Sequence, residues 1–310
     1  MKLSIVMPAY NEQENIAVVI GELCKVMQGI DTIASFEVIV VDDHSSDETA
    51  EQVLALGNPN ARCLRLSRRS GSHTAIRAGL ANASGDAVLC ISSDGQDNPT
   101  VLKEMIERWQ SGVQVVWAIR RSREETFKDK MAAVLFYYTL KLFANSGQSN
   151  IDLANADFYL LDRKAVDAIN ACSERNTSLF GLIIWIGFRQ EGVLYDRRER
   201  LNGKSKWSFK SRLRLAQDWI MAFSGVPLKL MTYLGISAAV IGFLYALFIF
   251  VAAIKGYTTP GWAESVLLML VGGGVLLIML GIIGEYLWRT LDETRKRPLF
   301  FIEKDTSKKA

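Results

Sequence analysis

Histidine is scarce in this chain, which has only His44 and His73 among its 310 residues. Histidine-rich metal centres need several ring nitrogens close together, so a centre of that kind is excluded. Cysteine is also sparse, and the four cysteines lie far apart without Cys-x-x-Cys spacing. We therefore expect free thiols rather than disulfide partners or zinc ligands.

Two sequence signals are missing near the N-terminus. No Gly-x-Gly-x-x-Gly motif follows the first predicted strand, which argues against a dinucleotide-dependent oxidoreductase. The first residues run directly into a strand pattern, without the apolar core and small-residue cleavage site of a secretory leader. We therefore expect no signal peptide.

Long apolar runs occur twice, at 230–253 and 266–288. Each is about long enough to cross the roughly 30 Å hydrocarbon core of a bilayer as a helix. The chain before them alternates β-rich and amphipathic stretches, which is typical of a water-soluble α/β enzyme. We therefore predict a catalytic body with a small membrane module.

Basic residues flank both apolar runs, while the connecting loop 255–264 is short and nearly neutral. The positive-inside rule then predicts that both flanks and the enzyme body lie in the cytoplasm and the loop lies outside. The basic flanking residues are Arg197, Arg198, Arg200, Lys204, Lys206, Lys210, Arg212 and Arg214 before the first run, and Arg289, Arg295, Lys296 and Arg297 after the second.

The first third of the chain reads as repeated strand, loop and helix. Asn11 with Glu14 resembles a capping box that opens the first helix, and Ser46 or Asp47 can cap the second. This order predicts a mostly parallel, doubly wound sheet. The expected strands are 3–7, 37–41, 62–66, 87–91 and 113–119. Four helices are expected between or after them: the first ends near residue 28, the second ends near residue 56, and the other two cover 74–82 and 99–110.

Charged and polar residues follow all five predicted strands, in the loops 8–12, 42–47, 67–73, 92–97 and 120–123. In such a sheet, ligands bind outside the carboxyl ends of the strands. Carboxylates hold cations and arginines bind phosphate oxygens. The loops together therefore predict a site for a metal-bound diphosphate.

These loops, in this order, resemble the inverting glycosyltransferases of family 2, which have the GT-A fold, a Rossmann-like α/β fold with a mostly parallel sheet. The polyprenyl-phosphate group, which includes dolichol-phosphate mannose synthases and bactoprenol glucosyltransferases, has the most similar pattern. The resemblance covers nearly the whole chain. Its most specific pieces are Asp-Phe-Tyr-Leu-Leu-Asp-Arg at 157–163 and Arg-Leu-Asn-Gly-Lys-Ser-Lys-Trp at 200–207, followed by the two apolar runs.

The resemblance also implies roles for individual residues. Ser92 replaces the first acid of the usual Asp-x-Asp, so one anionic ligand is lost and we expect weaker metal binding. The implied set is Asp157 for catalysis; Pro8, Tyr10, Glu12 and Asp42 or Asp43 for the nucleoside; Asp94 and Gln96 for Mg²⁺ or Mn²⁺; and Arg120, Arg200, Ser205 and Lys206 for the diphosphate and the lipid phosphate.

The domain expectation combines the residue pattern with the resemblance. We expect a cytoplasmic GT-A domain at 1–207, an interfacial amphipathic helix at 208–228, two transmembrane helices at 229–289 and a basic cytoplasmic tail at 290–310. Ordinary core packing is the alternative for the segment before the first span. The apolar run 127–142 is expected to pack on the sheet or to lie at the membrane surface.

The expected activity is transfer of one sugar, with inversion, from a nucleotide sugar to undecaprenyl or another polyprenyl phosphate at the cytoplasmic leaflet of the inner membrane. A UDP-linked glucose or related sugar is the expected donor, and cell-envelope or O-antigen modification the expected setting. Membrane lipid is an expected partner and nucleic acid is not. Glycines 272–274 and 281 would permit close helix contact within a protomer or in a homo-oligomer.

Two other functions remain open at this point. Processive polysaccharide synthases have a similar fold but use a Gln-x-x-Arg-Trp element after the catalytic acid. Here Arg108 and Trp109 follow Met105 on an early helix, which is the wrong region. The other alternative is a nucleotide-binding membrane scaffold with weakened catalysis, which the serine at position 92 motivates.

Overall fold

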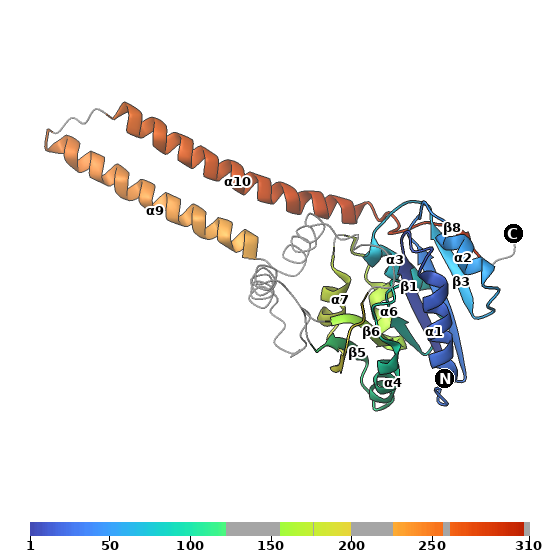
Figure 1. Ribbon diagram of the computed structural model, residues 1–310. Helices are drawn as coiled ribbons and strands as arrows, with labels where there is room; N and C mark the ends of the chain where they lie inside the picture. The colour runs from blue at the N-terminus through green and yellow to red at the C-terminus, as the bar shows by residue number, and fades with distance from the viewer. Residues whose placement is uncertain (122–155, 176, 200–225, 257–260, 307–310) are drawn as a thin grey trace.

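The computed structural model describes residues 1–121, 156–175, 177–199, 226–256 and 261–306. An α/β body carries a long hairpin of two helices that projects from one side of it (Figure 1). Predictions for the helix at 127–142, for the interfacial segment at 208–225 and for Arg200, Ser205 and Lys206 lie outside the described residues.

An eight-stranded mixed sheet forms the centre of the body, in the order β7-β5-β6-β4-β1-β2-β3-β8. The β1–β2, β1–β4, β2–β3 and β5–β7 pairs are parallel, while β6 and β8 run antiparallel to their neighbours. The predicted mostly parallel sheet is therefore confirmed. The strands are β1 (Lys2–Ala9), β2 (Ser35–Asp42), β3 (Ala61–Leu66), β4 (Ala87–Cys90), β5 (Val115–Arg120), β6 (Ala156–Asp162), β7 (Gln190–Tyr195) and β8 (Ile302–Asp305).

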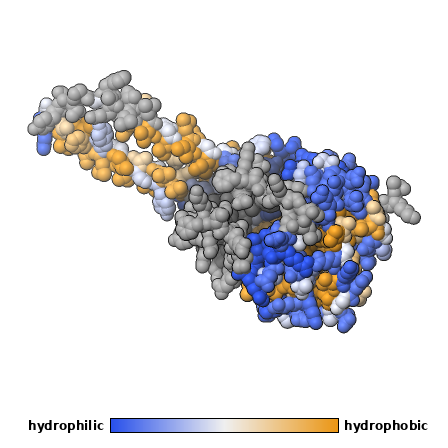
Figure 2. All heavy atoms as spheres, viewed as in Figure 1, coloured by the Kyte–Doolittle hydropathy of each residue, from blue (hydrophilic) through white to orange (hydrophobic). Residues whose placement is uncertain are grey.

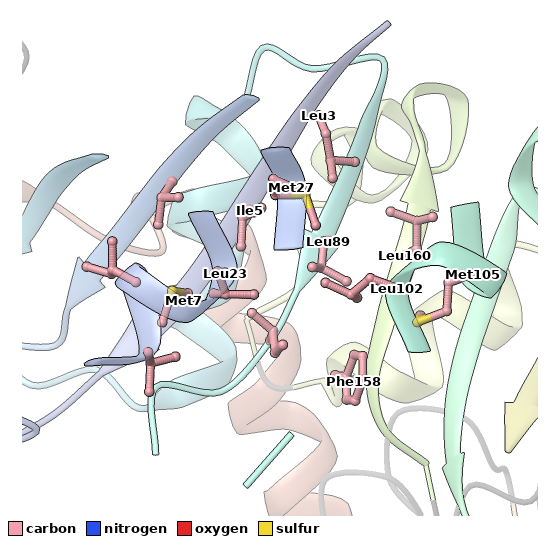
Figure 3. Close-up of a cluster of buried hydrophobic side chains, with 14 of the residues drawn as sticks. Leu3, Ile5, Met7, Leu23, Met27, Leu89, Leu102, Met105, Phe158 and Leu160 are labelled. Carbon is pink, nitrogen blue, oxygen red and sulfur yellow. The ribbon is translucent and has the colours of Figure 1, made fainter. Parts of the chain in front are cut away.

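Helices cover both faces of the sheet. Successive side chains of a strand point to opposite faces. Ile5 and Met7 of β1 accordingly join the cluster with α1 and α4 (Figure 3), while Val6 between them joins the cluster with α3, α6 and α7. The helices of the body are α1 (Ile16–Gln28), α2 (Thr49–Ala55), α3 (Ser72–Asn82), the short 3₁₀ turn η1 (Pro99–Val101), α4 (Leu102–Gln110), α6 (Arg163–Ala171) and α7 (Leu179–Trp185).

The first two helices begin differently from one another. The capping box at Asn11 and Glu14 is wrong, because α1 begins at Ile16 and Asn11 has a φ of 54°. The Asn11 Oδ1 instead accepts a hydrogen bond from the Ser46 backbone N–H at 2.9 Å. This bond joins the loop after β1 to the loop after β2. The N-cap of α2 is Glu48, so the prediction that Ser46 or Asp47 caps this helix is wrong, although the Asp47 Oδ1 accepts from the Thr49 N–H at 3.1 Å.

The projecting hairpin consists of α9 (Val226–Ile254) and α10 (Trp262–Thr294). Both helices are long and apolar enough to cross a membrane, and the most apolar stretch of each is not buried within the chain, although Met231 near the start of α9 is buried. Figure 2 shows apolar residues along the hairpin and mostly polar residues on the visible face of the body. Residues 226–228, predicted to end an interfacial helix, belong to α9.

Close contact within the hairpin occurs at a different glycine from those predicted. A Cβ on Gly235 of α9 would lie 3.3 Å from the methyl carbon of Met279, whereas one on Gly272, Gly273, Gly274 or Gly281 would meet nothing within 4 Å. Close packing of the glycine cluster within the protomer is therefore wrong. Contact between protomers stays a prediction.

The chain returns to the body after α10. The last strand, β8, pairs antiparallel with β3 and forms an edge of the sheet. The Ser67 N–H donates to the Phe301 carbonyl at 3.0 Å, and the Thr306 N–H donates to the Cys63 carbonyl at 3.1 Å. Part of the segment expected as a basic tail is therefore built into the sheet, and both ends of the hairpin join the same body.

Candidate active site

The candidate site lies at the carboxyl edge of the sheet, where strands of opposite direction meet. Tyr195 ends β7 and is aligned with Arg120, which ends the neighbouring parallel strand β5. The antiparallel strand β6 begins at this same edge, and its second residue is Asp157. Three strands therefore bring a phenol, a guanidinium and a carboxylate together.

Asp157 is bound from two sides. Its Oδ2 accepts a hydrogen bond from the Tyr195 hydroxyl at 2.5 Å and lies 2.8 Å from the Arg120 Nε. Its Oδ1 lies 3.5 Å from an Nη of Arg197, just beyond β7. The side chain is mostly buried. A carboxylate with two arginines and a phenol around it is held in one orientation while its charge is balanced.

The acidic loop after β4 lies beside this carboxylate. The Asp94 Oδ1 accepts from the Ser92 hydroxyl at 2.7 Å, and the Gln96 Oε1 accepts from an Nη of Arg197 at 2.8 Å. Arg197 therefore touches both Gln96 and Asp157. The predicted metal residues and the predicted catalytic acid share one arginine, although their roles stay predictions.

Asp97 links the acidic loop after β4 to the surroundings of Asp157. It is 6% exposed, and its two carboxylate oxygens lie 2.6 Å from the Ser92 Oγ and 3.3 Å from the Tyr195 hydroxyl. Burial raises the pKa of Asp97 to about 6, and the neighbouring Asp157 adds to the rise against hydrogen bonds from Ser92. A continuous chain of polar contacts thus runs from Asp94 through Asp97 to Asp157.

The donor set of the acidic loop limits which metal it could hold. Within the described residues, no three side chains of the histidine, cysteine, aspartate or glutamate type gather as metal ligands. Asp94 and Gln96 offer one carboxylate and one amide oxygen. Such a set suits Mg²⁺, which usually keeps several waters and takes further oxygens from substrate phosphates.

The two acids at the end of β2 organise the neighbouring loops. Asp42 is 0% exposed, and its oxygens accept from the Ser45 N–H at 2.9 Å and from an Nη of Arg65 at 2.6 Å. Asp43 accepts from the Ser70 and Gly71 N–H groups at 2.6 and 2.8 Å. Burial raises the pKa of Asp43, while these two bonds oppose the rise.

The end of β1 and the loop after it contribute the other predicted nucleoside residues. The Tyr10 ring is covered by the guanidinium of Arg69, whose Cζ is 4.0 Å from the ring centroid. The buried carboxylate of Glu12 accepts from the Asn15 side chain at 2.7 Å, and the Pro8 carbonyl accepts from the Ser93 hydroxyl at 2.9 Å. These residues are adjacent at the sheet edge, and their contact with a nucleoside stays a prediction.

Sequence reasoning missed three residues of the site. Tyr195 ends a strand that was not predicted, and Asp97 was noticed only as part of an acidic loop. Arg197 was counted only among the basic residues before the first apolar run, but it contacts Asp157 and Gln96, and Arg198 contacts Glu22 at 2.5 Å. The signal available was the clustering of arginines directly after a Val-Leu-Tyr run.

Comparison with known proteins identifies similar chains over the full length. The family model described as glycosyl transferase family 2 matches residues 4–169. An uncharacterised glycosyltransferase of Synechocystis sp. is 38% identical over 306 residues, covering 97% of this chain and 95% of its own. The bactoprenol glucosyl transferase of Shigella phage SfV is 34% identical over 313 residues, covering 99% of this chain and 100% of its own.

Solved structures share the fold of the body. Mannosyl-3-phosphoglycerate synthase from Rubrobacter xylanophilus has a TM-score of 0.50 at 20% identity and covers 72% of each chain. Glucosyl-3-phosphoglycerate synthase from Mycobacterium tuberculosis, solved with Mg²⁺ and uridine diphosphate, has a TM-score of 0.50 at 19% identity, with 71% of this chain and 77% of that chain covered. The predicted GT-A fold is confirmed by these likenesses.

Proposed function

Because the chain belongs to glycosyl transferase family 2, we propose that it transfers one sugar from a nucleotide sugar to a polyprenyl phosphate at a membrane surface. Family membership makes the chain a glycosyltransferase. The prenyl-phosphate acceptor, the UDP-linked donor with glucose or a related sugar, and the inversion at the anomeric carbon are the proposed refinements.

One observation carries this proposal: an apolar helix hairpin is attached to a sugar-transfer body. The phage bactoprenol glucosyl transferase matches 99% of the chain, so the match includes the hairpin. A nucleotide sugar dissolves in water and needs no such anchor. An acceptor with a long isoprenoid tail stays in the bilayer, and an enzyme fixed there meets its phosphate directly.

Asp157 has a limited chemical task in this reaction. A phosphate monoester has a second pKa near 6 and is largely dianionic at pH 7, so a strong base is not required. The carboxylate, oriented by Tyr195, Arg120 and Arg197, would steer the acceptor phosphate in line with the leaving diphosphate, take up a residual proton or hold a sugar hydroxyl. Attack from the face opposite the leaving group inverts the anomeric centre.

The departing diphosphate is the main electrostatic problem. Asp94 and Gln96 would hold Mg²⁺ or Mn²⁺, which supplies positive charge to the leaving group. Arg120 and Arg197 add fixed cations at the same edge. We propose that Arg200, Ser205 and Lys206, in the segment before α9, complete the phosphate contacts, and that Pro8, Tyr10, Glu12, Asp42 and Asp43 form the nucleoside side.

The proposed location is the cytoplasmic membrane, with the body of 1–207 in the cytoplasm and the hairpin of 229–289 crossing twice. Basic residues are numerous on both flanks of the hairpin, whereas the connecting loop contains one lysine and one glutamate and is nearly neutral, which favours this orientation. The pairing of β8 with β3 supports it as well, because both ends of the hairpin must lie on one side.

The test is transfer by the purified full-length protein in liposomes that contain undecaprenyl phosphate. The donor is radiolabelled UDP-glucose, followed by other UDP- and GDP-linked sugars, with Mg²⁺ present. A chloroform-soluble product with one sugar per lipid is the expected result, and NMR of the product should show inverted configuration.

Two outcomes would contradict the proposal. A water-insoluble polymer of many sugars identifies a processive synthase instead. Nucleotide binding without product from any donor identifies a scaffold that has lost catalysis, in which Ser92 would be the first residue to examine.

A further inference from the structure

The end of α10 is joined to the catalytic body by side-chain contacts as well as by the chain. The Glu293 Oε1 accepts a hydrogen bond from the Arg175 backbone N–H at 2.7 Å, and the Asp292 Oδ2 lies 3.6 Å from the Arg175 Nε. Arg175 and Asp292 are each 19% exposed. Water screens a partly buried pair less than a surface pair.

The loop that carries Arg175 is itself bound by a buried arginine. It follows α6, which follows β6 and therefore Asp157 directly in sequence. Arg77 of α3, 8% exposed, donates to the Cys172 and Glu174 carbonyls of this loop. The helix α3 begins next to Gly71, which binds Asp43 at the nucleoside side of the site. The contacts of Arg175 therefore connect α10 both to the strand that carries Asp157 and to the nucleoside side of the site at Asp43.

The position of the joint along α10 also matters. Residues 265–284 carry no charged side chain, and Glu285 with Arg289 forms the first ion pair beyond them, at 2.9 Å. At 1.5 Å per residue, the uncharged stretch spans about 30 Å, the thickness of the hydrocarbon core. Glu293 lies about 12 Å further along the helix, at the depth of the headgroups or just beyond them.

We propose that Arg175, Asp292 and Glu293 form a rigid joint that fixes the height and tilt of the catalytic body above the bilayer, so that the acceptor phosphate emerges at Asp157. Arg175 and Glu293 are thus positioning residues that touch no substrate. The inference rests on the proposed function, since only an acceptor fixed in the membrane requires a fixed height.

Two acceptors test this joint. Undecaprenyl phosphate in liposomes needs the correct height, whereas a short-chain prenyl phosphate dissolved in detergent-free buffer reaches the site by diffusion. In the Arg175→Ala/Glu293→Ala double variant, transfer to the liposome acceptor should fall at least tenfold. Transfer to the short acceptor and the affinity for uridine diphosphate, measured by calorimetry, should stay within about twofold of wild type.

Matched variants separate positioning from folding. Glu293→Gln keeps an acceptor oxygen for the Arg175 N–H and should retain most liposome activity. Asp167→Asn removes the Arg163–Asp167 ion pair, which spans 3.5 Å within α6, and should leave both acceptors unaffected.

The inference is overturned if the double variant loses both acceptors in parallel, which indicates a general structural role, or if it loses neither. A wild-type protein that uses neither acceptor, while still binding the nucleotide, overturns the proposed function and the inference with it.

Discussion

The Tyr195 hydroxyl lies 2.5 Å from Oδ2 of Asp157, across the strand that separates β7 from β6. Burial raises the pKa of Tyr195 above its ordinary value, and the nearby carboxylates raise it further. The phenol therefore keeps its proton and is a hydrogen-bond donor to Asp157. Because Arg120 ends the intervening strand β5 and lies 2.8 Å from the same oxygen, the carboxylate is held by side chains of both β5 and β7.

Removing this phenol should slow the reaction without weakening donor binding. A hydrogen bond to a charged group contributes about 1.5–3 kcal/mol, so Tyr195→Phe should lower kcat by roughly 10- to 100-fold if the bond orients Asp157 for the transition state. Initial rates of lipid-linked product formation measure this, with the KM for the donor expected to stay within about twofold of wild type. Wild-type rates in Tyr195→Phe would show that the orientation of Asp157 is not limiting.

Asp157→Asn should remove most turnover and leave nucleotide binding intact.

The order of strands and their loops was predictable because buried parallel strands and their polar ends leave a local pattern in the sequence. The first strands and the loops carrying Asp42 and Asp94 were found in this way. The pairing of Tyr195, Arg197 and Asp157 was not, since it depends on an antiparallel strand and on residues far apart in the chain. The strand β8 could not be predicted either, because its pairing with β3 also joins residues far apart in the chain. A strand of only four residues after a long apolar helix has the sequence pattern of a tail.

Restoring an acid at position 92 should change the metal dependence. The Ser92 hydroxyl lies between Asp94 and Asp97, within 2.7 Å of each carboxylate. Ser92→Asp places a third negative charge there, which repels the other two without metal and binds Mg²⁺ more tightly. The melting temperature without Mg²⁺ should fall, and the Mg²⁺ concentration for half-maximal activity should drop several-fold. Ser92→Ala, which adds no charge, is the control. Unchanged Mg²⁺ dependence in Ser92→Asp would place the metal elsewhere.

His73 should make folding sensitive to acid. Its Nδ1 accepts from the Leu179 N–H at 3.2 Å, its ring lies 5.7 Å from that of Phe180, and burial lowers its pKa to about 4. The folded state therefore binds the proton less readily than the unfolded state does. The contribution of His73 to the free energy of unfolding is therefore fully present above about pH 6.5 and is lost as the pH falls towards 4. The loss is at most about 3 kcal/mol, since the residue is only partly shielded from solvent.

Thermal unfolding between pH 4 and 7.5 measures this loss. His73→Gln removes the titrating group and should flatten the dependence of melting temperature on pH in that window. His44→Gln changes the other histidine, which lies on the exposed edge near Glu303, and should leave the wild-type slope. An unchanged slope in His73→Gln would assign the acid sensitivity to other groups.

Arg65 should be required for donor binding, whereas Arg62 on the same strand should not. Both pair with β8: the Arg65 Nε lies 3.4 Å from Glu303, and an Nη of Arg62 lies 3.7 Å from Asp305. Only Arg65 reaches the buried Asp42, at 2.6 Å. Because removing one partner leaves the other charge buried and uncompensated, Arg65→Gln should weaken uridine diphosphate binding by tenfold or more in calorimetry, and Arg62→Gln by less than twofold. Equal losses in both variants would mean that strand β3 is merely destabilised, and that Asp42 does not depend on its arginine to meet the nucleoside.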